Sequence, residues 1–324
     1  MTEQPRISVV IPVKNEAVGM AACLDGILAQ TVAVAEIVVI DSGSTDGTQD
    51  IVRRYPKARL IEIPPTDDNH GDTRSLGVSE SSGDFVLFTV GDARPVDDRW
   101  IARMLAGFID DDVAAVGGIQ VVAHDRRNNP LEWFRPASEP TRTIHRFGSA
   151  EAFDAADAAS RQDACVIDDV TSMYRRSFLR QVPFRRAVYG EDMLICVDAL
   201  RAGHALVREP AAQVYHYHLQ NYRTTLQRTV AVCIMRRELF GTTPPAQVAH
   251  PFREAVRLLR EPSLSFRERL HWWRNQRECF RGVVDGIAIF EEAAAQGAEG
   301  LAALSQEYLG APPIPVKPGQ VDAA

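Results

Sequence analysis

The chain has few of the features that mark membrane-spanning or disulfide-rich proteins. Among its 324 residues no stretch approaches ~20 consecutive apolar positions, the length that a spanning helix needs. The first residues, MTEQPRISVV, lack a basic segment followed by an apolar one, so we expect no secretion signal. The five cysteines are an odd number, scattered and without a C-x-x-C motif, which argues against a disulfide framework or a thiolate zinc site. We therefore expect a protein of the reducing cytoplasm.

Two common nucleotide-binding signatures are also missing. No G-x-G-x-x-G motif follows the first apolar run, where residues 12–16 read PVKNE, and this counts against a dinucleotide-dependent oxidoreductase. The pattern G-x-x-x-x-G-K-[ST] of P-loop phosphotransferases is absent as well. With a formal net charge of −7 and no motif of a nucleic-acid reader, the composition argues against nucleic acid as a partner.

The charge that is present is unevenly distributed. Residues 221–281 contain twelve Arg and five Glu, a local balance of +7, so the rest of the chain is more acidic than the total suggests. Aromatic residues such as Trp272 and Phe280 are interleaved with these arginines, as in helices that lie on an anionic membrane. Helices that merely cover a sheet would show the same composition. The first interpretation predicts peripheral, salt-sensitive contact of residues 221–281 with the inner face of the membrane.

The first half of the chain alternates in the way that a parallel sheet requires. Apolar runs predict strands near Ile7–Pro12, Ile37–Asp41, Ala58–Ile63, Phe85–Val90 and Ala114–Ile119. Amphipathic stretches between them predict helices near Met20–Gln30, Gly47–Arg54, Thr73–Ser81 and Arg99–Phe108. This order predicts an α/β fold with an open, twisted, mostly parallel sheet flanked by helices. Ligands bind such sheets beyond the carboxyl ends of the strands.

The second half is less regular. Periodicity fades from Val121 to Asp163, where we expect a long irregular segment. The pattern then predicts regular structure at Val166–Tyr174, a helix at Glu191–Ala202, and short strands at Ala205–Arg208 and Gln213–His216. Helices are predicted beyond Asn221, and the proline-rich end is not expected to pack. We therefore predict a domain over residues 1–220, a helical extension over 221–310 and a flexible tail over 311–324.

Polar residues follow the first two predicted strands. The segment PVKNE contains Pro12, Asn15 and Glu16, and the segment DSGSTDGT contains Asp41 and Ser44. Oxygen atoms of Asp and Ser can accept hydrogen bonds from a base or a ribose, and the N–H groups of a glycine-containing turn can face an anion. Ser44 taken alone is more simply explained as a helix cap. Asp41, at the tip of its strand, is harder to explain in that way.

Two further segments contain candidate metal ligands. The fourth strand leads into GDARP, where Asp92 follows Gly91 and could hold Mg²⁺ or Mn²⁺, or could simply be a turn residue. His216 and His218 alternate along an extended segment, so both imidazoles would lie on one face and could reach the same ion. One packed and one solvated histidine is an equally good interpretation.

The helix at Glu191–Ala202 begins with two acidic residues. Acidic side chains in a first turn often only complement the helix dipole. Alternatively, Glu191 or Asp192 is a general base that removes a proton from an incoming hydroxyl group.

Taken together, these segments resemble a known family. The residues SVVIPVKNE (8–16), VIDSGSTDGT (39–48) and Gly190-Glu191-Asp192, with Gly203 and Pro210, are similar to those of the inverting GT-A glycosyltransferases that use nucleoside-diphosphate sugars. The resemblance covers the chain from about residue 6 to residue 220. Within the family, the segments HGDTR (70–74), GDARP (91–95) and VYHYH (214–218) most resemble the rhamnosyltransferase-like branch.

The resemblance implies a role for each candidate residue. The nucleoside pocket would be lined by Pro12, by Asn15 or Glu16, and by Asp41, with Asp41 near the base. Arg74 and Arg94 would meet the diphosphate, and Asp192 matches the catalytic base. The full set of implied donor-binding residues is Pro12, Asn15, Glu16, Asp41, Ser44, Arg74, Gly91, Asp92 and Arg94.

The implied metal site departs from the family pattern. Asp92 stands where the family's Asp-x-Asp motif lies, but Arg94 occupies the position of the second acid. His216 or His218 would then complete the shell of Mg²⁺ or Mn²⁺, or dependence on the metal would be weak. The missing acid also leaves open a degenerate nucleotide-sugar-binding or scaffold subunit, which donor hydrolysis would distinguish from an enzyme.

The implied reaction moves a sugar, rhamnose or another deoxy sugar, from a UDP- or dTDP-linked donor to a hydroxyl acceptor, with inversion at the anomeric carbon. The resemblance is compatible with synthesis of a glycan, a glycolipid or a secondary metabolite, with a lipid-linked acceptor, and with a homodimer.

Overall fold

The computed structural model describes residues 5–67, 69–125, 127–133, 141–165, 167–187, 189–243 and 250–310. The chain divides into two compact units, one of residues 1–122 and 136–217 and the other of residues 123–135 and 218–324. The division lies near the predicted start of the helical extension at residue 221. The segment 123–135 belongs to the second unit, and the predicted tail lies outside the described residues. The proposed domain limits stay a prediction.

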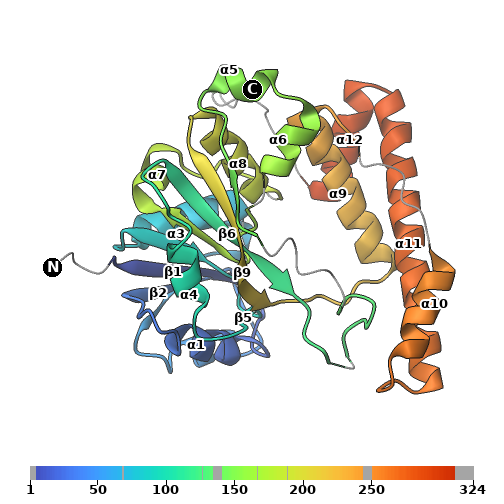
Figure 1. Ribbon diagram of the computed structural model, residues 1–324, viewed down its shortest axis with the longest axis horizontal. Coiled ribbons are helices and arrows are strands. Elements are labelled where there is room, and N and C mark those ends of the chain that lie inside the picture. Colours follow the sequence, from blue (N-terminus) through green and yellow to red (C-terminus); the bar gives the residue numbers. More distant parts are fainter. Residues whose placement is uncertain are drawn as a thin grey trace. The chain divides into compact units, whose positions relative to one another are not determined.

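The first unit is built on one mixed sheet of nine strands, counted within the described residues, in which β3, β2, β1 and β4 run parallel. Next to them, β8 is antiparallel to both β4 and β6, β6 and β9 are parallel, and β5 and β7 pair antiparallel with β9. The strands, drawn in Figure 1, are β1 (Ile7–Val13), β2 (Glu36–Asp41), β3 (Ala58–Glu62), β4 (Phe85–Phe88), β5 (Arg94–Pro95), β6 (Val113–Val121), β7 (Thr143–His145), β8 (Ser172–Arg175) and β9 (Ala205–Tyr215).

Helices cover both faces of this sheet. Val9 and Ile11 of β1 belong to a buried cluster that includes residues of α1 and α4, such as Trp100. On the opposite face, Val10 lies so close to Gly77 of α3 that an added Cβ would come within 2.3 Å of Val10 Cγ1. The helices of this unit are α1 (Met20–Leu28), α2 (Thr48–Val52), α3 (His70–Glu80), α4 (Trp100–Leu105), α5 (Ala150–Ala155), α6 (Ala158–Ala164), α7 (Arg176–Gln181) and α8 (Glu191–Arg201).

The predicted α/β fold class is confirmed, and the first five predicted strands match the observed ones to within two residues at each end. Two predictions were wrong. The segment 121–163 is not wholly irregular, because it contains β7, α5 and α6, and the two helices begin at side-chain caps from Ser149 and Asp157. The two short strands predicted after residue 204 are one strand, β9, in which Pro210 lies at a register irregularity where no ladder donor is needed.

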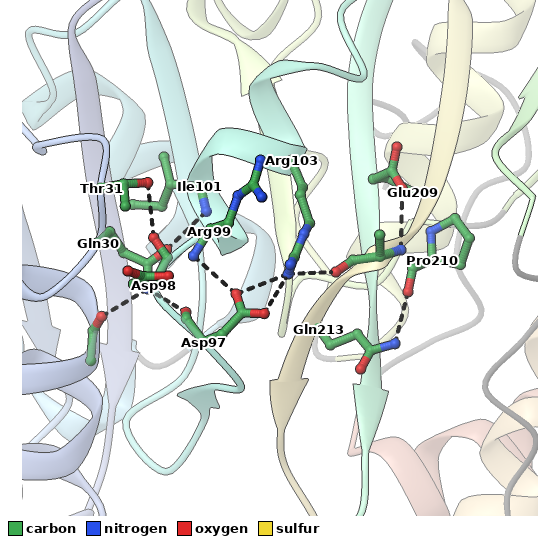
Figure 2. A network of polar contacts seen from close by, with 12 residues as sticks. Gln30, Thr31, Asp97, Asp98, Arg99, Ile101, Arg103, Glu209, Pro210 and Gln213 are labelled. Atoms are coloured by element: carbon green, nitrogen blue, oxygen red, sulfur yellow. Dashed lines mark hydrogen bonds and ion pairs between the residues drawn. The ribbon is translucent and has the colours of Figure 1, made fainter.

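A polar network holds the segment between β5 and α4 (Figure 2). The Asp97 carboxylate accepts hydrogen bonds from Arg103 Nη1 at 2.8 and 2.9 Å, and the same nitrogen donates to the carbonyl oxygen of Ala211 in β9 at 3.0 Å. Gln30, just after α1, donates from Nε2 to the carbonyl oxygen of Asp97 at 2.8 Å. The network joins α1, α4 and β9, and it thereby positions the preceding residues 92–95.

The second unit is helical, as predicted. Its helices are α9 (Tyr222–Phe240), α10 (Pro251–Arg260), α11 (Phe266–Ala295) and α12 (Ala298–Leu309). Val230 of α9, Phe290 of α11 and Leu304 of α12 share one buried cluster. Gly282 of α11 allows close approach to α9, because an added Cβ would lie 2.6 Å from the carbonyl oxygen of Tyr222. None of the helices described in this structure combines the length and the apolar character needed to cross a bilayer.

Candidate active site

The carboxyl end of β2 presents a buried carboxylate with one unused oxygen. Asp41 is 0% exposed, and its Oδ1 accepts hydrogen bonds from Gly43 N at 3.0 Å, Ser44 N at 2.9 Å and Gln49 Nε2 at 2.8 Å. Its Oδ2 is buried and has no hydrogen-bond partner among the described residues. Burial alone would raise the pKa of Asp41, but hydrogen bonds from Ser44 and Gln49 lower it below its ordinary value. Oδ2 is therefore a charged acceptor that lacks a donor.

The segments that follow β1 and β2 are locked together. Asn15 N donates to Ser44 Oγ at 2.8 Å, and Thr45 N donates to Asn15 Oδ1 at 2.8 Å. Asn15 has a φ of 60°, a left-handed conformation that asparagine tolerates better than most residues. Pro12 pairs in register with Ile40 on the neighbouring strand. The structure therefore brings Pro12, Asn15 and Ser44 to one end of the sheet beside Asp41.

The segment after β1 also reaches the end of β4. An added Cβ on Gly91 would lie 2.9 Å from Glu16 Cβ, so the close approach of these two segments requires glycine at this position. Burial and the negative charge of Asp92 raise the pKa of Glu16 to about 7, against a smaller lowering by His216. The Glu16 carboxylate therefore lies in the field of both Asp92 and His216.

Asp92 and His216 form a pair that can bind a metal ion. His216 Nε2 lies 3.4 Å from Asp92 Oδ1. His218, the other predicted ligand, is the first residue of the second unit, so its part in this cluster stays a prediction. A carboxylate oxygen and imidazole nitrogens are suitable ligands for a divalent ion.

The second ring nitrogen of His216, Nδ1, is held by a relay of hydrogen bonds through Gln120 to Asp168. His216 Nδ1 lies 2.6 Å from Gln120 Oε1, and Gln120 Nε2 donates a hydrogen bond to the Asp168 carboxylate. Because the amide oxygen can only accept, this contact requires a proton on Nδ1, and the other ring nitrogen, Nε2, is directed at Asp92. Either a metal ion bound by both side chains or a proton between them suits the distance of 3.4 Å. The donor set therefore fits a divalent ion.

Arg94 lies at the margin of this cluster. It pairs with Tyr215 across β5 and β9, and its guanidinium lies 5.1 Å from the centroid of the Tyr215 ring. The side chain is exposed, so it can reach an anion at the carboxyl end of the sheet. Its contact with a diphosphate stays a prediction.

Arg74 occupies a different environment, in a buried ionic network. Its Nε lies 2.8 Å from Asp169 Oδ2, and its Nη1 lies 2.6 Å from Glu191 Oε1. His70 Nδ1 lies 3.3 Å from the other oxygen of Glu191. Asp169 also accepts hydrogen bonds from Ser172 Oγ at 2.6 Å and Tyr174 OH at 2.8 Å. Both contacts of Arg74 in this network are with carboxylates, and its predicted contact with a diphosphate is untested.

Asp192 is the second residue of α8 and directly follows Glu191 of this network. Burial raises its pKa well above the ordinary value, as do the charges of Glu191, Asp168 and Asp169, and Arg74 only partly opposes them. The raised pKa makes the Asp192 carboxylate a better proton acceptor than an exposed aspartate. Asp168 connects the two parts of the site, since it contributes to this field and also holds Gln120.

Sequence reasoning missed three residues of this arrangement: Gln120, Asp168 and Asp169. The adjacent pair Asp168–Asp169, inside the segment Val166–Tyr174 that was predicted to be regular, could have been noticed. Gln120 lies inside a strand and carries no comparable signal, because its role depends on β6 and β9 being neighbours.

A comparison with known protein families shows to which family this chain belongs. The family described as Glycosyl transferase family 2 matches residues 8–182, more than half of the chain. The chain belongs to this family. The family 2 match includes the ends of β1, β2 and β4 and the residues Gln120, Asp168 and Asp169, whereas Asp192 and His216 lie beyond its end.

Related proteins include two named as O-antigen chain rhamnosyltransferases. RfbN of Salmonella typhimurium is 28% identical over 227 residues, 69% of this chain and 70% of that protein. WbaN of Salmonella anatum is 30% identical over 213 residues, 61% of this chain and 62% of that protein. The glycosyltransferase AglE of Haloferax volcanii is 36% identical over 119 residues. That match spans 35% of this family 2 chain and only 39% of the archaeal protein.

Solved structures confirm the GT-A fold. The mannosyltransferase PcManGT from Pyrobaculum calidifontis, in complex with GDP-Man and Mn²⁺, superimposes with a TM-score of 0.54 at 18% identity, over 94% of this chain and 80% of that chain. Residues 1–349 of TarS from S. aureus, in complex with UDP-GlcNAc, give a TM-score of 0.52 at 15% identity, over 90% and 92% of the two chains. At these identities the likeness shows the fold of the family 2 chain. The roles of the individual site residues stay predictions.

Proposed function

We propose that this family 2 chain transfers a sugar from a nucleoside-diphosphate donor to a hydroxyl acceptor, with inversion at the anomeric carbon. The observation that carries the proposal is the combination, in the first unit, of an unused acceptor on Asp41, the Asp92–His216 pair, and the Asp192 carboxylate in the first turn of α8 beside the Arg74 network. The first two lie at the carboxyl ends of parallel strands, where open α/β sheets bind ligands. The names of RfbN and WbaN favour rhamnose or another deoxy sugar and a saccharide acceptor. The donor would be linked to UDP or dTDP, as the resemblance of the sequence implies.

Asp41 would bind the nucleoside. Its orphan Oδ2 would accept a hydrogen bond from an N–H group of the base, which would satisfy an otherwise unpaired buried charge. Pro12, Asn15 and Ser44 would form the walls of the nucleoside site. They lie at the joined ends of β1 and β2, beside Asp41.

Asp92, His216 and His218 would hold the divalent ion, and Arg94 would lie beside it. When bound, the ion would neutralise charge on the leaving diphosphate. Two imidazole ligands favour Mn²⁺ over Mg²⁺, since Mg²⁺ prefers an all-oxygen shell. The presence of His216 and His218 compensates for the absence of a second acid at Arg94, which weakens the alternative of a degenerate scaffold subunit.

Asp192 would be the general base. Its carboxylate would take the proton of the acceptor hydroxyl group while that oxygen forms a bond to the anomeric carbon from the face opposite the diphosphate. The bond between the anomeric carbon and the diphosphate oxygen breaks with its electron pair, which leaves on the nucleoside diphosphate. Arg74 would act as a positioning residue, because it holds Glu191, the neighbour of Asp192, through a buried ion pair.

A donor panel tests this function. A thermal-shift screen of UDP- and dTDP-sugars with Mn²⁺ should find a donor that stabilises the protein, and that donor should be hydrolysed slowly without acceptor. Asp92→Ala should weaken the binding of this donor at least ~10-fold and abolish its dependence on Mn²⁺, because the ion loses its carboxylate. Asp98→Ala, an exposed aspartate on the same segment, is the matched control. Donor binding that ignores both chelator and Asp92→Ala would rule out the metal site.

Gln120→Leu tests the relay behind His216. In the metal-free protein, ¹⁵N NMR should show His216 protonated at Nδ1, and the variant should lose this preference because the acceptor is gone. The affinity for Mn²⁺ should fall by about 10–100-fold. Gln213→Leu, a neutral change of the same size in β9, should leave both measurements unchanged. An unaltered tautomer in Gln120→Leu would contradict the proposed role.

A further inference from the structure

Helix α10 has two apolar stripes, and only one of them is buried. Leu258 is 2% exposed and packs in a cluster with Leu131, Leu264 and Trp272. Phe252 and Leu259 are 79% and 62% exposed. The helix therefore needs only one of its stripes to pack within the second unit.

The helical spacing defines the outer stripe. Phe252, Val256 and Leu259 stand at positions i, i+4 and i+7, so they share one face, roughly 120° around the helix from Leu258. By the same geometry, the arginines of α10 lie on the exposed side next to this stripe. They are Arg253, Arg257 and Arg260, and all three are exposed.

The first turns of α11 extend this pattern. Phe266 and Leu270, again at i and i+4, are 74% and 37% exposed. Only residues 261–265 separate α10 from α11, and the two helices touch, because Trp273 Nε1 donates to the carbonyl oxygen of Pro251 at 3.3 Å. The docking face consists of Phe252, Val256, Leu259, Phe266 and Leu270.

This concentration of exposed apolar residues is unusual for the molecule. Among the described residues, ten large apolar side chains are exposed, and four of them, including the two phenylalanines, belong to the docking face. Apolar side chains that are exposed singly need no explanation, but four of them on two touching helices, within 19 residues of sequence, indicate an interaction site.

The charge around the docking face selects the partner. Residues 251–274 contain six arginines and three glutamates. The glutamates are engaged locally: Glu254 lies 3.8 Å from Arg277, Glu261 accepts from Ser263 Oγ at 2.6 Å, and Glu268 caps α11 through Ser265 N at 2.7 Å. A second copy of this chain would present the same arginines and repel the first. An anionic bilayer accepts both the phenylalanines and the arginines.

We infer that the second unit docks onto anionic lipid bilayers through the docking face, with Phe252, Leu259 and Phe266 at the level of the acyl chains. The arginines beside them contact the phosphates of the headgroups. The surface belongs entirely to the second unit, so the inference does not depend on the proposed function.

Vesicle cosedimentation of the full chain tests the inference. We expect binding to phosphatidylcholine vesicles that contain phosphatidylglycerol, and much weaker binding to pure phosphatidylcholine. The double variant Phe252→Glu/Leu259→Glu should reduce the lipid partition coefficient at least ~10-fold, because each apolar group would be replaced by a charge at the interface. Ile109→Glu/Ile144→Glu makes the same change at two exposed sites of the first unit and should leave binding unaltered.

Salt and arginine variants test the contribution of charge to vesicle binding, and circular dichroism tests whether the variants fold. Raising the salt from about 0.05 M to about 0.5 M should weaken binding by screening the arginines, and Arg253→Glu/Arg260→Glu should weaken it already at low salt. All three double variants should keep the circular dichroism spectrum and donor hydrolysis of the wild type, since the substituted side chains are exposed. Absence of binding to anionic vesicles at low salt would overturn the inference. So would unaltered binding of Phe252→Glu/Leu259→Glu, or a concentration-dependent dimer that this variant abolishes.

Discussion

Asp192→Asn lowers the turnover number at least ~10²-fold while the affinity for the donor stays nearly unchanged. The amide cannot accept the proton of the incoming hydroxyl group, and a general base acts in the transition state rather than in the binding of the donor. Single-turnover kinetics with the identified donor, together with isothermal titration of the donor, separate the two quantities. Asp50→Asn, an exposed carboxylate on α2, should leave both unchanged.

The raised pKa of Asp192 predicts how activity and stability should each change with pH. Activity of the wild type should rise with pH through this pKa, because only the ionised form is a base, and the variant should lack this limb. Ionisation of a partly buried group with a raised pKa costs stability, so its contribution is present at low pH and lost as pH rises through the folded-state pKa. The neutral variant should therefore melt no lower than the wild type above that pH. An inactive variant with a lower melting temperature would point to misfolding instead of a lost base.

Arg74→Met destabilises the protein by about 3–5 kcal/mol, because it leaves two buried carboxylates without their cation. Arg74 is 8% exposed and pairs with Asp169 at 2.8 Å and with Glu191 at 2.6 Å. For a unit of this size, the loss corresponds to a fall in melting temperature of about 6–20 °C. Differential scanning calorimetry measures it directly.

A matched control variant and the pH dependence distinguish the loss of the buried network from a general effect of removing an arginine. Arg59→Met breaks an exposed pair with Glu80, with side chains 46% and 40% exposed, and should cost less than ~1 kcal/mol. Burial would raise the pKa of Glu191, but Arg74 and His70 lower it, so the stability gained from this ionised group is lost as pH falls through its folded-state pKa. The difference between wild type and Arg74→Met should therefore shrink in acid. Equal losses for Arg59→Met and Arg74→Met would contradict the buried network.

The sequence by itself determined the alternation of strands and helices in the first half of the chain. Apolar runs such as that of β1 are buried on both faces and need no distant partner to be recognised. Because parallel strands end at the same edge of a sheet, the sequence also determined that Asp41 and Asp92 lie at one edge. The resemblance of these segments is sufficient to indicate the family.

Only the tertiary structure decided which side chains meet. The insertion of β8 between β4 and β6 brings Asp169 against Arg74, 95 residues earlier in the chain, and the neighbouring strands β6 and β9 place Gln120 behind His216. No periodicity encodes the order of strands in a sheet, so these contacts had no signature in the sequence. The same holds for α10, where Leu258 and Leu259 are equally apolar. Packing against Trp272 buries the first, and the turn of the helix leaves the second exposed.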